Sequence, residues 1–318
     1  MFGDYKIKIR ILFLLAATGF GGACEKVSPI GVLVTGSEVE DRVQMSVLYY
    51  QVHLKDQVQL KATGDYTFLI GSDSHLTTKP GRLDQMLDIG LKSDDLFYAH
   101  LGDIADTKAE YYVRLDSLLK EGKKKYLAVH GLGPDSRVVF PFFPIVGNHD
   151  VTRNGWALWS NIFHASYYEI DVQVTQGEKT VWDHLVFLDT ASGTLGESQI
   201  HLMTEAIRNG KTADGGAYRY TFVFSHTNIF RPQFNEMAST FPREEQFFLL
   251  DSFSRWNVTA VFCGHVHTWD QRNYGGVEYI TLEAMSEHNN PAPGKYLLRV
   301  KVPASTELPV EFERIHML

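Results

Sequence analysis

Five short polar clusters in this 318-residue chain combine carboxylate, imidazole and amide side chains, the ligand types that suit borderline divalent metal ions. They are Asp73-Ser74-His75, Gly102-Asp103-Ile104-Ala105-Asp106, Gly147-Asn148-His149-Asp150, Ser225-His226 and Gly264-His265-Val266-His267. Taken alone, each cluster is more often a turn or a satisfied polar residue than a metal site. Five of them in succession would rarely arise by chance, so together they predict a metal site.

Each cluster directly follows a stretch that we expect to form a β-strand. These apolar runs cover residues 66–71, 96–101, 138–146, 218–224 and 258–263. In open α/β sheets the carboxyl ends of the strands face one crevice, so the five clusters can meet there. Alternate residues of an extended segment share a face, which favours His265 and His267 as a pair on one side.

The remaining patterns predict helices and further strands between and after these runs. Helical spacing occurs at residues 83–91, 111–119, 156–163, 199–207 and 243–253, and with ambiguous periodicity within 38–54. Further strands are expected at residues 167–174, 181–188, 277–282, 296–302 and 310–314. Alternating strands and helices followed by a strand-rich end predict a layered α/β domain with mixed sheets.

Composition excludes several classes of protein. With 44% hydrophobic and 21% charged residues, the chain is neither disordered nor fibrous. Thirty Lys and Arg against 38 Asp and Glu give a net charge of −8, so no stable nucleic-acid partner is expected. The sequence contains no Gly-x-Ser-x-Gly elbow and no Gly-x-x-x-x-Gly-Lys loop, which argues against other common hydrolases.

The first residues have the pattern of an export signal. A basic start at residues 6–10 precedes an apolar run at 11–17, which is too short to span a bilayer, and small residues lead up to Cys24. This order resembles a bacterial lipoprotein signal, in which an acylated Cys24 becomes the new N-terminus, although Gly21 replaces the usual Leu. The alternative is plain cleavage near Ala23, which leaves a free thiol.

We therefore divide the chain into three parts. Residues 1–23 form the signal peptide, 24–60 a lipid-anchor tether with an accessory segment, and 61–318 the catalytic domain. Acylation of Cys24 would leave Cys263 without a partner for an intrachain disulfide. The expected location is the cell envelope, with the protein exported and anchored to the membrane through Cys24.

The five clusters, in their order, resemble the signature of the calcineurin-like metallophosphoesterase superfamily. That signature reads Asp-x-His, Gly-Asp-x-x-Asp, Gly-Asn-His-Asp/Glu, a single His and Gly-His-x-His, and all five blocks are present between Asp73 and His267. The resemblance implies a four-layer α/β/β/α sandwich with two mixed β-sheets. It also implies two divalent metal ions, Mn, Fe or Zn, at the strand ends.

The resemblance further implies which residues bind these ions. The first metal would be held by Asp73, His75 and His267, the second by Asn148, His226 and His265, and Asp103 would bridge the two. Two such cations can hold a bridging hydroxide and clamp the phosphoryl oxygens during in-line attack.

The neighbours of these ligands have catalytic counterparts in the family. His149 is interpreted as the general acid that protonates the leaving alkoxide, and Asp106 as the carboxylate that orients it. Asp150 is expected behind the ligands, where carboxylates commonly position ligating imidazoles. The alternative for Asp106 and Asp150 is a turn-capping role. Arg153 could clamp a substrate phosphate with its guanidinium, or could be a solvated loop residue.

Two departures from family patterns narrow the function. Asp106 stands where purple acid phosphatases have a tyrosine ligand, which argues against a tyrosinate-bound iron centre. Thr107 stands where serine/threonine protein phosphatases have an arginine, which argues against phosphoprotein phosphatase activity.

Taken together, the sequence predicts an exported two-metal phosphoesterase that hydrolyses phosphate mono- or diesters by attack of a metal-bridging hydroxide. The alternative is a non-catalytic metal-binding scaffold protein of the envelope. The sequence leaves open which phosphate ester is the substrate.

Overall fold

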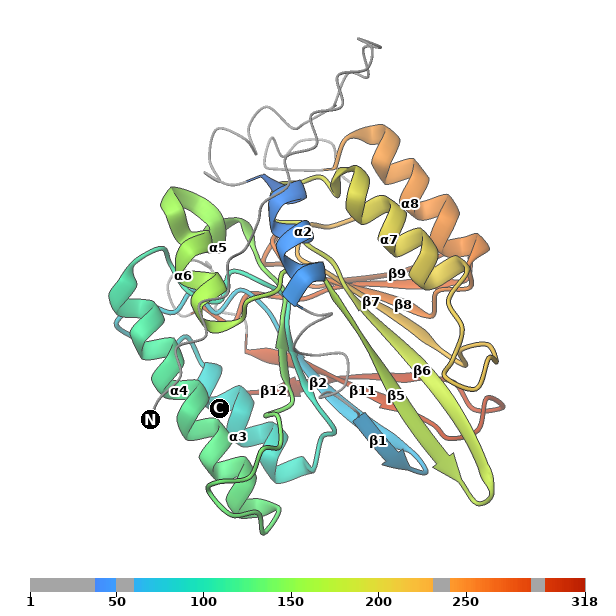
Figure 1. Ribbon diagram of the computed structural model, residues 1–318, viewed down its shortest axis with the longest axis horizontal. Coiled ribbons are helices and arrows are strands. Elements are labelled where there is room, and N and C mark those ends of the chain that lie inside the picture. Colours follow the sequence, from blue (N-terminus) through green and yellow to red (C-terminus); the bar gives the residue numbers. More distant parts are fainter. Residues whose placement is uncertain (1–37, 50–59, 231–240, 287–294, 318) are drawn as a thin grey trace, which may run out of the picture.

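The computed structural model describes residues 38–49, 60–230, 241–286 and 295–317. Two β-sheets face each other, and helices cover their outer faces (Figure 1). This arrangement confirms the predicted four-layer α/β/β/α sandwich with two mixed sheets. The predictions for residues 1–23 and for Cys24 lie outside the described residues.

The smaller sheet has five strands in the order β12-β11-β2-β3-β4. Its strands are β2 (Tyr66–Gly71), β3 (Tyr98–His100), β4 (Phe142–Pro144), β11 (Tyr296–Val302) and β12 (Glu311–His316). The first three are parallel, and β11 pairs antiparallel with both β2 and β12. The carboxyl ends of β2, β3 and β4 therefore lie at the same edge of the sheet.

The larger sheet has seven strands in the order β1-β5-β6-β7-β8-β10-β9. They are β1 (Leu60–Thr63), β5 (Tyr168–Gln176), β6 (Lys179–Phe187), β7 (Thr221–Ser225), β8 (Ala260–Cys263), β9 (Asp270–Tyr274) and β10 (Val277–Thr281). Strands β6, β7, β8 and β10 are parallel, whereas β5 and β9 run antiparallel to their partners β6 and β10.

Aromatic side chains fill the space between the two sheets. The ring centroids of Phe68 and Phe97 are 4.5 Å apart, and those of Phe187 and Phe224 are 4.3 Å apart. All four side chains are fully buried. Close-packed aromatic layers of this kind resist deformation, so they hold the strand ends of both sheets in fixed relative positions.

Two further apolar clusters attach the helices to the outer faces of the sheets. The five-stranded sheet is covered by α3 (Leu83–Ser93), α4 (Ala109–Val129) and α6 (Gly155–Ile162). The seven-stranded sheet is covered by α2 (Val39–Tyr49), α7 (Gly196–Arg208) and α8 (Arg243–Arg255). Among the described residues, no helix combines the length and apolar character needed to cross a bilayer.

Helix α2 confirms the expected helix within residues 38–54 and packs against the body of the domain. Val39 and Val43 are buried in the same cluster as the apolar residues of α7 and α8, and the Ser198 amide of α7 donates to Glu40 (3.1 Å). Leu60, just before the predicted boundary at residue 61, pairs with Val172 of β5.

Some predicted elements differ from the observed ones for identifiable reasons. The run at 138–146 forms only the three-residue strand β4, because prolines at 141 and 144 have no N–H to donate to a neighbouring strand. The helix expected at 111–119 continues to Val129, through a lysine-rich stretch that carries little apolar signal. Strand β9 was not predicted because its residues are polar and mostly exposed.

Candidate metal centre

The seven predicted metal ligands come together at the carboxyl ends of strands from both sheets. Asp73 follows β2 and Asp103 follows β3, while His226 and His265 follow β7 and β8 of the other sheet. The side chains form two adjacent groups that share Asp103. The aromatic layer between the sheets therefore fixes the geometry of this site.

The first group consists of Asp73, His75, Asp103 and His267. The Nε2 atoms of His75 and His267 are 3.2 Å apart, and His267 Nε2 lies 3.3 Å from Asp73 Oδ1. His75 Nε2 lies 3.8 Å from Asp103 Oδ2. Four potential ligand atoms thus surround one small volume.

The second group is centred on His226. Its Nε2 atom lies 2.9 Å from Asn148 Oδ1, 3.2 Å from His265 Nδ1 and 3.4 Å from Asp103 Oδ2. Asp103 Oδ2 therefore faces imidazoles of both groups, which is the position that a bridging carboxylate needs.

These residues fit divalent metal ions. Metal–ligand bonds of about 2.1 Å at angles of about 90–110° place neighbouring ligand atoms about 3.0–3.4 Å apart, close to the separations seen here. Asp73 Oδ1 is buried and has no hydrogen-bond partner, an arrangement that is costly without a cation nearby. The Nδ1–H of His226 donates to the carbonyl of Leu101 (2.7 Å), which leaves the Nε2 lone pair facing the other acceptors.

The second carboxylate oxygen of Asp73 and that of the shared Asp103 are held by hydrogen bonds within the protein. Asp73 Oδ2 accepts hydrogen bonds from the Ser72 hydroxyl and from the His265 amide. Asp103 Oδ1 accepts from the His149 amide (2.7 Å). Each carboxylate is therefore fixed in orientation and presents its other oxygen to the centre. Sequence reasoning missed Ser72, although it lies next to a predicted ligand.

The centre concentrates negative charge. Burial lowers the pKa of His75, but nearby carboxylates, beginning with Asp106, outweigh burial and raise that pKa to about 9. Burial also lowers the pKa of His226, and Asp103 raises it to about 9. Burial raises the pKa of Asp73, yet neighbouring imidazoles lower it to about 2. The carboxylates thus stay ionised and attract positive charge, so metal ions and protons compete for the same imidazole nitrogens.

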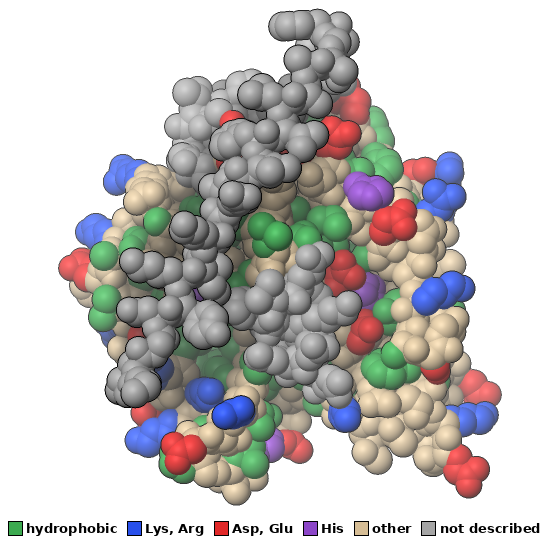
Figure 2. All heavy atoms as spheres, in the orientation of Figure 1, with side chains coloured by type: hydrophobic (Ala, Val, Ile, Leu, Met, Phe, Trp, Pro, Cys, Tyr) green, Lys and Arg blue, Asp and Glu red, His purple; other side chains and the backbone are tan. Residues whose placement is uncertain are grey.

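This local charge differs from the charge of the surface. Acidic and basic side chains are interspersed over the described part of the face shown in Figure 2. On this face the two signs of charge are therefore mixed, whereas bound cations would dominate the field inside the centre.

Most of the ligands sit on left-handed backbone. The φ angles of Asp73, His75, Asp103, His265 and His267 lie between 41° and 69°, a region that costs non-glycine residues free energy and is often found at functional sites. The expectation that His265 and His267 share one face of an extended segment is wrong. The left-handed turns send His265 to the second group and His267 to the first.

Two glycines allow the ligand loops to approach one another. A Cβ atom at residue 147 would collide with the backbone and side chain of Asp103. A Cβ atom at residue 264 would collide with the side chains of Ser72 and Asp73. Glycine in these two motif positions therefore has a steric reason.

His149 and Asp106 lie at the open side of the centre. Their side chains are 48% and 36% exposed, and Asp106 Oδ1 is 3.8 Å from His149 Nδ1. The same oxygen lies 3.4 Å from the Nδ1 atom of the metal-ligand candidate His75. Asp106 therefore stands between two imidazoles rather than serving His149 alone.

Asp150 is fully buried and differs in role from the expectation. Its carboxylate accepts hydrogen bonds from the backbone amides of Ile104, Ala105 and Gly147 and from the Tyr112 hydroxyl. Burial, followed by the charge of Asp103, raises its pKa to about 7. In the described structure Asp150 thus ties two ligand loops together through their backbones and does not orient an imidazole.

Three further residues lie after or before the ligand clusters in the sequence, and none of them is placed among the ligand atoms. Arg153 is exposed and adopts a left-handed backbone four residues after His149, compatible with contact to a substrate. The Trp269 ring carries the Arg314 guanidinium over one face, with 4.7 Å to the ring centroid. Burial lowers the pKa of His100 to about 3, so this residue is a neutral side chain beneath the centre.

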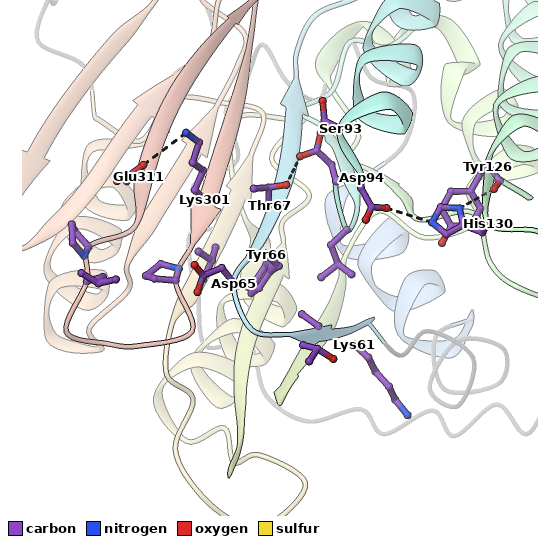
Figure 3. A pocket seen from close by; sticks show the side chains of 18 residues that line it. Lys61, Asp65, Tyr66, Thr67, Ser93, Asp94, Tyr126, His130, Lys301 and Glu311 are labelled. Atoms are coloured by element: carbon purple, nitrogen blue, oxygen red, sulfur yellow. Dashed lines mark hydrogen bonds and ion pairs between the residues drawn. The ribbon is translucent and has the colours of Figure 1, made fainter. Parts of the chain in front are cut away.

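The described residues also form a cavity of about 680 Å³, shown from close by in Figure 3. It is lined by residues at the start of β2, such as Tyr66 and Thr67, whereas the metal ligands follow the other end of that strand. Its wall includes the His130–Asp94 pair (3.7 Å). The cavity is thus separate from the candidate metal centre.

Comparison with known proteins agrees with this architecture. The family model for calcineurin-like phosphoesterase matches residues 66–269, a stretch that contains every predicted metal ligand. No curated protein matches the chain.

Solved structures are similar to this chain at low sequence identity. GAP50 from Plasmodium, the anchor in the inner membrane complex, is 13% identical, with a TM-score of 0.50 over 80% of this chain and 90% of that chain. A dimetal phosphatase from Danio rerio is 13% identical, with a TM-score of 0.42 over 78% of this chain and 98% of that chain.

Proposed function

Because the chain belongs to the calcineurin-like phosphoesterase family, we propose that it hydrolyses phosphate mono- or diesters at a centre of two divalent metal ions. One observation carries the proposal: ligands from five separate loops converge into two groups joined by Asp103 Oδ2. Mixed carboxylate, imidazole and amide ligands suit Mn, Fe or Zn.

Each side chain contributes to such a reaction in a definable way. When bound, the two cations would activate a water molecule for in-line attack and neutralise the phosphoryl oxygens. Asp73, His75 and His267 would hold one ion, and His226, His265 and the neutral amide of Asn148 the other. Asp103 would fix the spacing of the two ions.

Departure of the leaving group needs a proton donor at the rim of the site. His149 is half exposed, and its backbone amide is anchored to Asp103 Oδ1 (2.7 Å), which fixes where its imidazole can reach. The Asp106 carboxylate, 3.8 Å from His149 Nδ1, would help to orient the ring. His149 is therefore well placed to donate a proton to the departing oxygen, and Arg153 is available to contact the substrate phosphate.

The alternative function is a metal-binding scaffold without catalysis. The Plasmodium protein of the same fold is described as an anchor in a membrane complex, and this description is the reason to consider a scaffold. In the present chain the complete ligand set lies beside His149 and Asp106, and this favours an enzyme over a scaffold.

A paired assay tests the proposal. We expect the protein lacking residues 1–24 and loaded with manganese to hydrolyse a chromogenic phosphodiester, the matching monoester, or both. A preference for the diester would indicate a phosphodiesterase, and a preference for the monoester a phosphatase. Bound metal without turnover of either ester would contradict the proposal and support the scaffold.

We also propose that the protein is exported and anchored in the envelope through an acylated Cys24, on the sequence pattern of residues 1–24. Mass spectrometry of the mature N-terminus is expected to find Cys24 as the first residue, with its mass increased by acyl chains. An unmodified cysteine, or a chain that still begins at Met1, would overturn the anchor.

A further inference from the structure

The ligand candidate His226 is held not only through its ring but also through its backbone. It follows the last residue of β7, where the sheet no longer supplies a partner for its amide. The Thr190 hydroxyl takes that place, since Thr190 Oγ1 accepts from the amides of His226 (2.9 Å) and Thr227 (3.0 Å). Thr190 is fully buried, in the loop that follows β6.

The residue before Thr190 is fixed by helix α2. Asp189 accepts two hydrogen bonds from the Arg42 guanidinium, from Nε to Oδ2 (2.7 Å) and from Nη2 to Oδ1 (2.9 Å). Both side chains are fully buried. A two-pronged, buried ion pair of this kind has one favourable geometry, so it restricts the loop strongly.

Helix α7 holds the backbone of the same residue. The amide of Asp189 donates to Gln199 Oε1 (2.7 Å), and Gln199 Nε2 donates to the carbonyl of Asp189 (2.8 Å). A continuous series of buried polar contacts therefore runs from Arg42 of α2 through Asp189 and Thr190 to His226.

We infer that Thr190 is a positioning residue for the second metal site, and that Arg42 holds Thr190 in place through Asp189. The inference rests on the proposed two-metal function. A shift of the His226 backbone would move Nε2 away from Asn148 and Asp103. Residues behind metal ligands commonly change metal affinity by 10–100-fold when they are replaced.

The test compares threonine variants of the full chain at the two ends of β7. Thr190→Val keeps the shape but removes the acceptor for two buried amides, and Thr190→Ser restores that acceptor. Thr259→Val is the matched control, because Thr259 Oγ1 accepts from the Thr221 amide (3.1 Å) at the end of β7 away from the centre. The readouts are calorimetric titration of metal-free protein with Mn²⁺ and thermal unfolding without metal.

We expect two binding steps in the wild-type protein. Thr190→Val should weaken one step by about 10–100-fold and leave the other unchanged. Thr190→Ser and Thr259→Val should bind both ions like the wild type, and Arg42→Lys, which loses the two-pronged geometry, should weaken the same step as Thr190→Val by a smaller factor. If Thr190→Val does not fold, Thr190→Cys, with its weak sulfur acceptor, takes its place.

The outcomes separate the inference from the function on which it rests. Wild-type protein that binds fewer than two ions would overturn both. Two normal binding steps in Thr190→Val would overturn the inference alone. Equal weakening in Thr259→Val would show a general loss of stability and overturn it as well. If Arg42→Lys binds both Mn²⁺ ions like the wild type while Thr190→Val binds one more weakly, the part of the inference that assigns a role to Arg42 of α2 would be overturned.

Discussion

Replacing Asp103 by alanine is expected to abolish turnover and to reduce metal binding from two ions to one or none. Asp103 Oδ2 is the one carboxylate oxygen that faces both groups of the described centre, at 3.8 Å from His75 Nε2 and 3.4 Å from His226 Nε2. Its loss removes a ligand from both sites at once. It also removes the negative charge that holds the two cations close together.

The measurement is metal content after dialysis, combined with kcat/KM on the better of the two chromogenic esters. Asp95→Ala is the matched control. Asp95 is a buried carboxylate just before β3, whereas Asp103 follows the other end of that strand, and Asp95 pairs with Arg299 of β11 (3.0 Å). That variant is expected to lose stability yet bind two ions when folded. An Asp103→Ala protein that keeps two ions and measurable turnover would show that the bridge is assigned to the wrong residue.

Local patterns in the sequence predicted a layered α/β domain with mixed sheets and the convergence of the polar clusters, whereas the four-layer sandwich was implied by the family resemblance. Apolar runs of strand length end directly before the polar clusters, and parallel strands place their carboxyl ends together. Strand β2 was predicted with the bounds that the structure shows, Tyr66–Gly71, since all of its signal lies within one buried run. The clusters at Asp73, Asp103 and His226 were likewise predicted in the correct position, just after the ends of β2, β3 and β7.

Contacts between distant parts of the chain could not be predicted in this way. Arg42 and Asp189 are 147 residues apart, and no periodicity relates a charged residue on a weakly amphipathic helix to a loop aspartate. The role of Thr190 could not be predicted either, because its hydroxyl accepts hydrogen bonds from backbone amides 36 and 37 residues away in the sequence. For Asp150 the sequence left two roles open, positioning an imidazole or capping a turn, and the structure shows the second, with backbone amides as its partners.

The backbone geometry at the centre also explains why His265 and His267 do not share one face, as their spacing in an extended segment had predicted. Their φ angles of 69° and 57° cost free energy, on the order of 1–3 kcal/mol each. Interactions made in the folded protein must offset that cost. The hydrogen bond from the His265 amide to Asp73 is one such interaction, and bound metal would supply more.

His149→Ala is expected to behave differently from Asp103→Ala, because only the side chain of His149 acts in the reaction. Its backbone amide, which donates to Asp103 Oδ1, is retained in alanine, so both metal ions should stay bound. We expect kcat to fall by about 10²–10⁴-fold on an ester with a poor leaving group, the range for loss of a general acid. With a good leaving group that needs no proton, the loss should be much smaller.

The comparison of the two esters is therefore the informative measurement, with metal content determined on the same samples. His130→Ala serves as the control, since His130 is an exposed histidine beside the cavity at the start of β2, away from the metal ligands, and should leave both rates unchanged. Equal losses on the two esters would assign His149 to substrate binding or positioning instead of proton transfer. Full activity on the ester with the poor leaving group would show that another group donates the proton. Asp106, which lies between His75 and His149, would then be the next residue to replace.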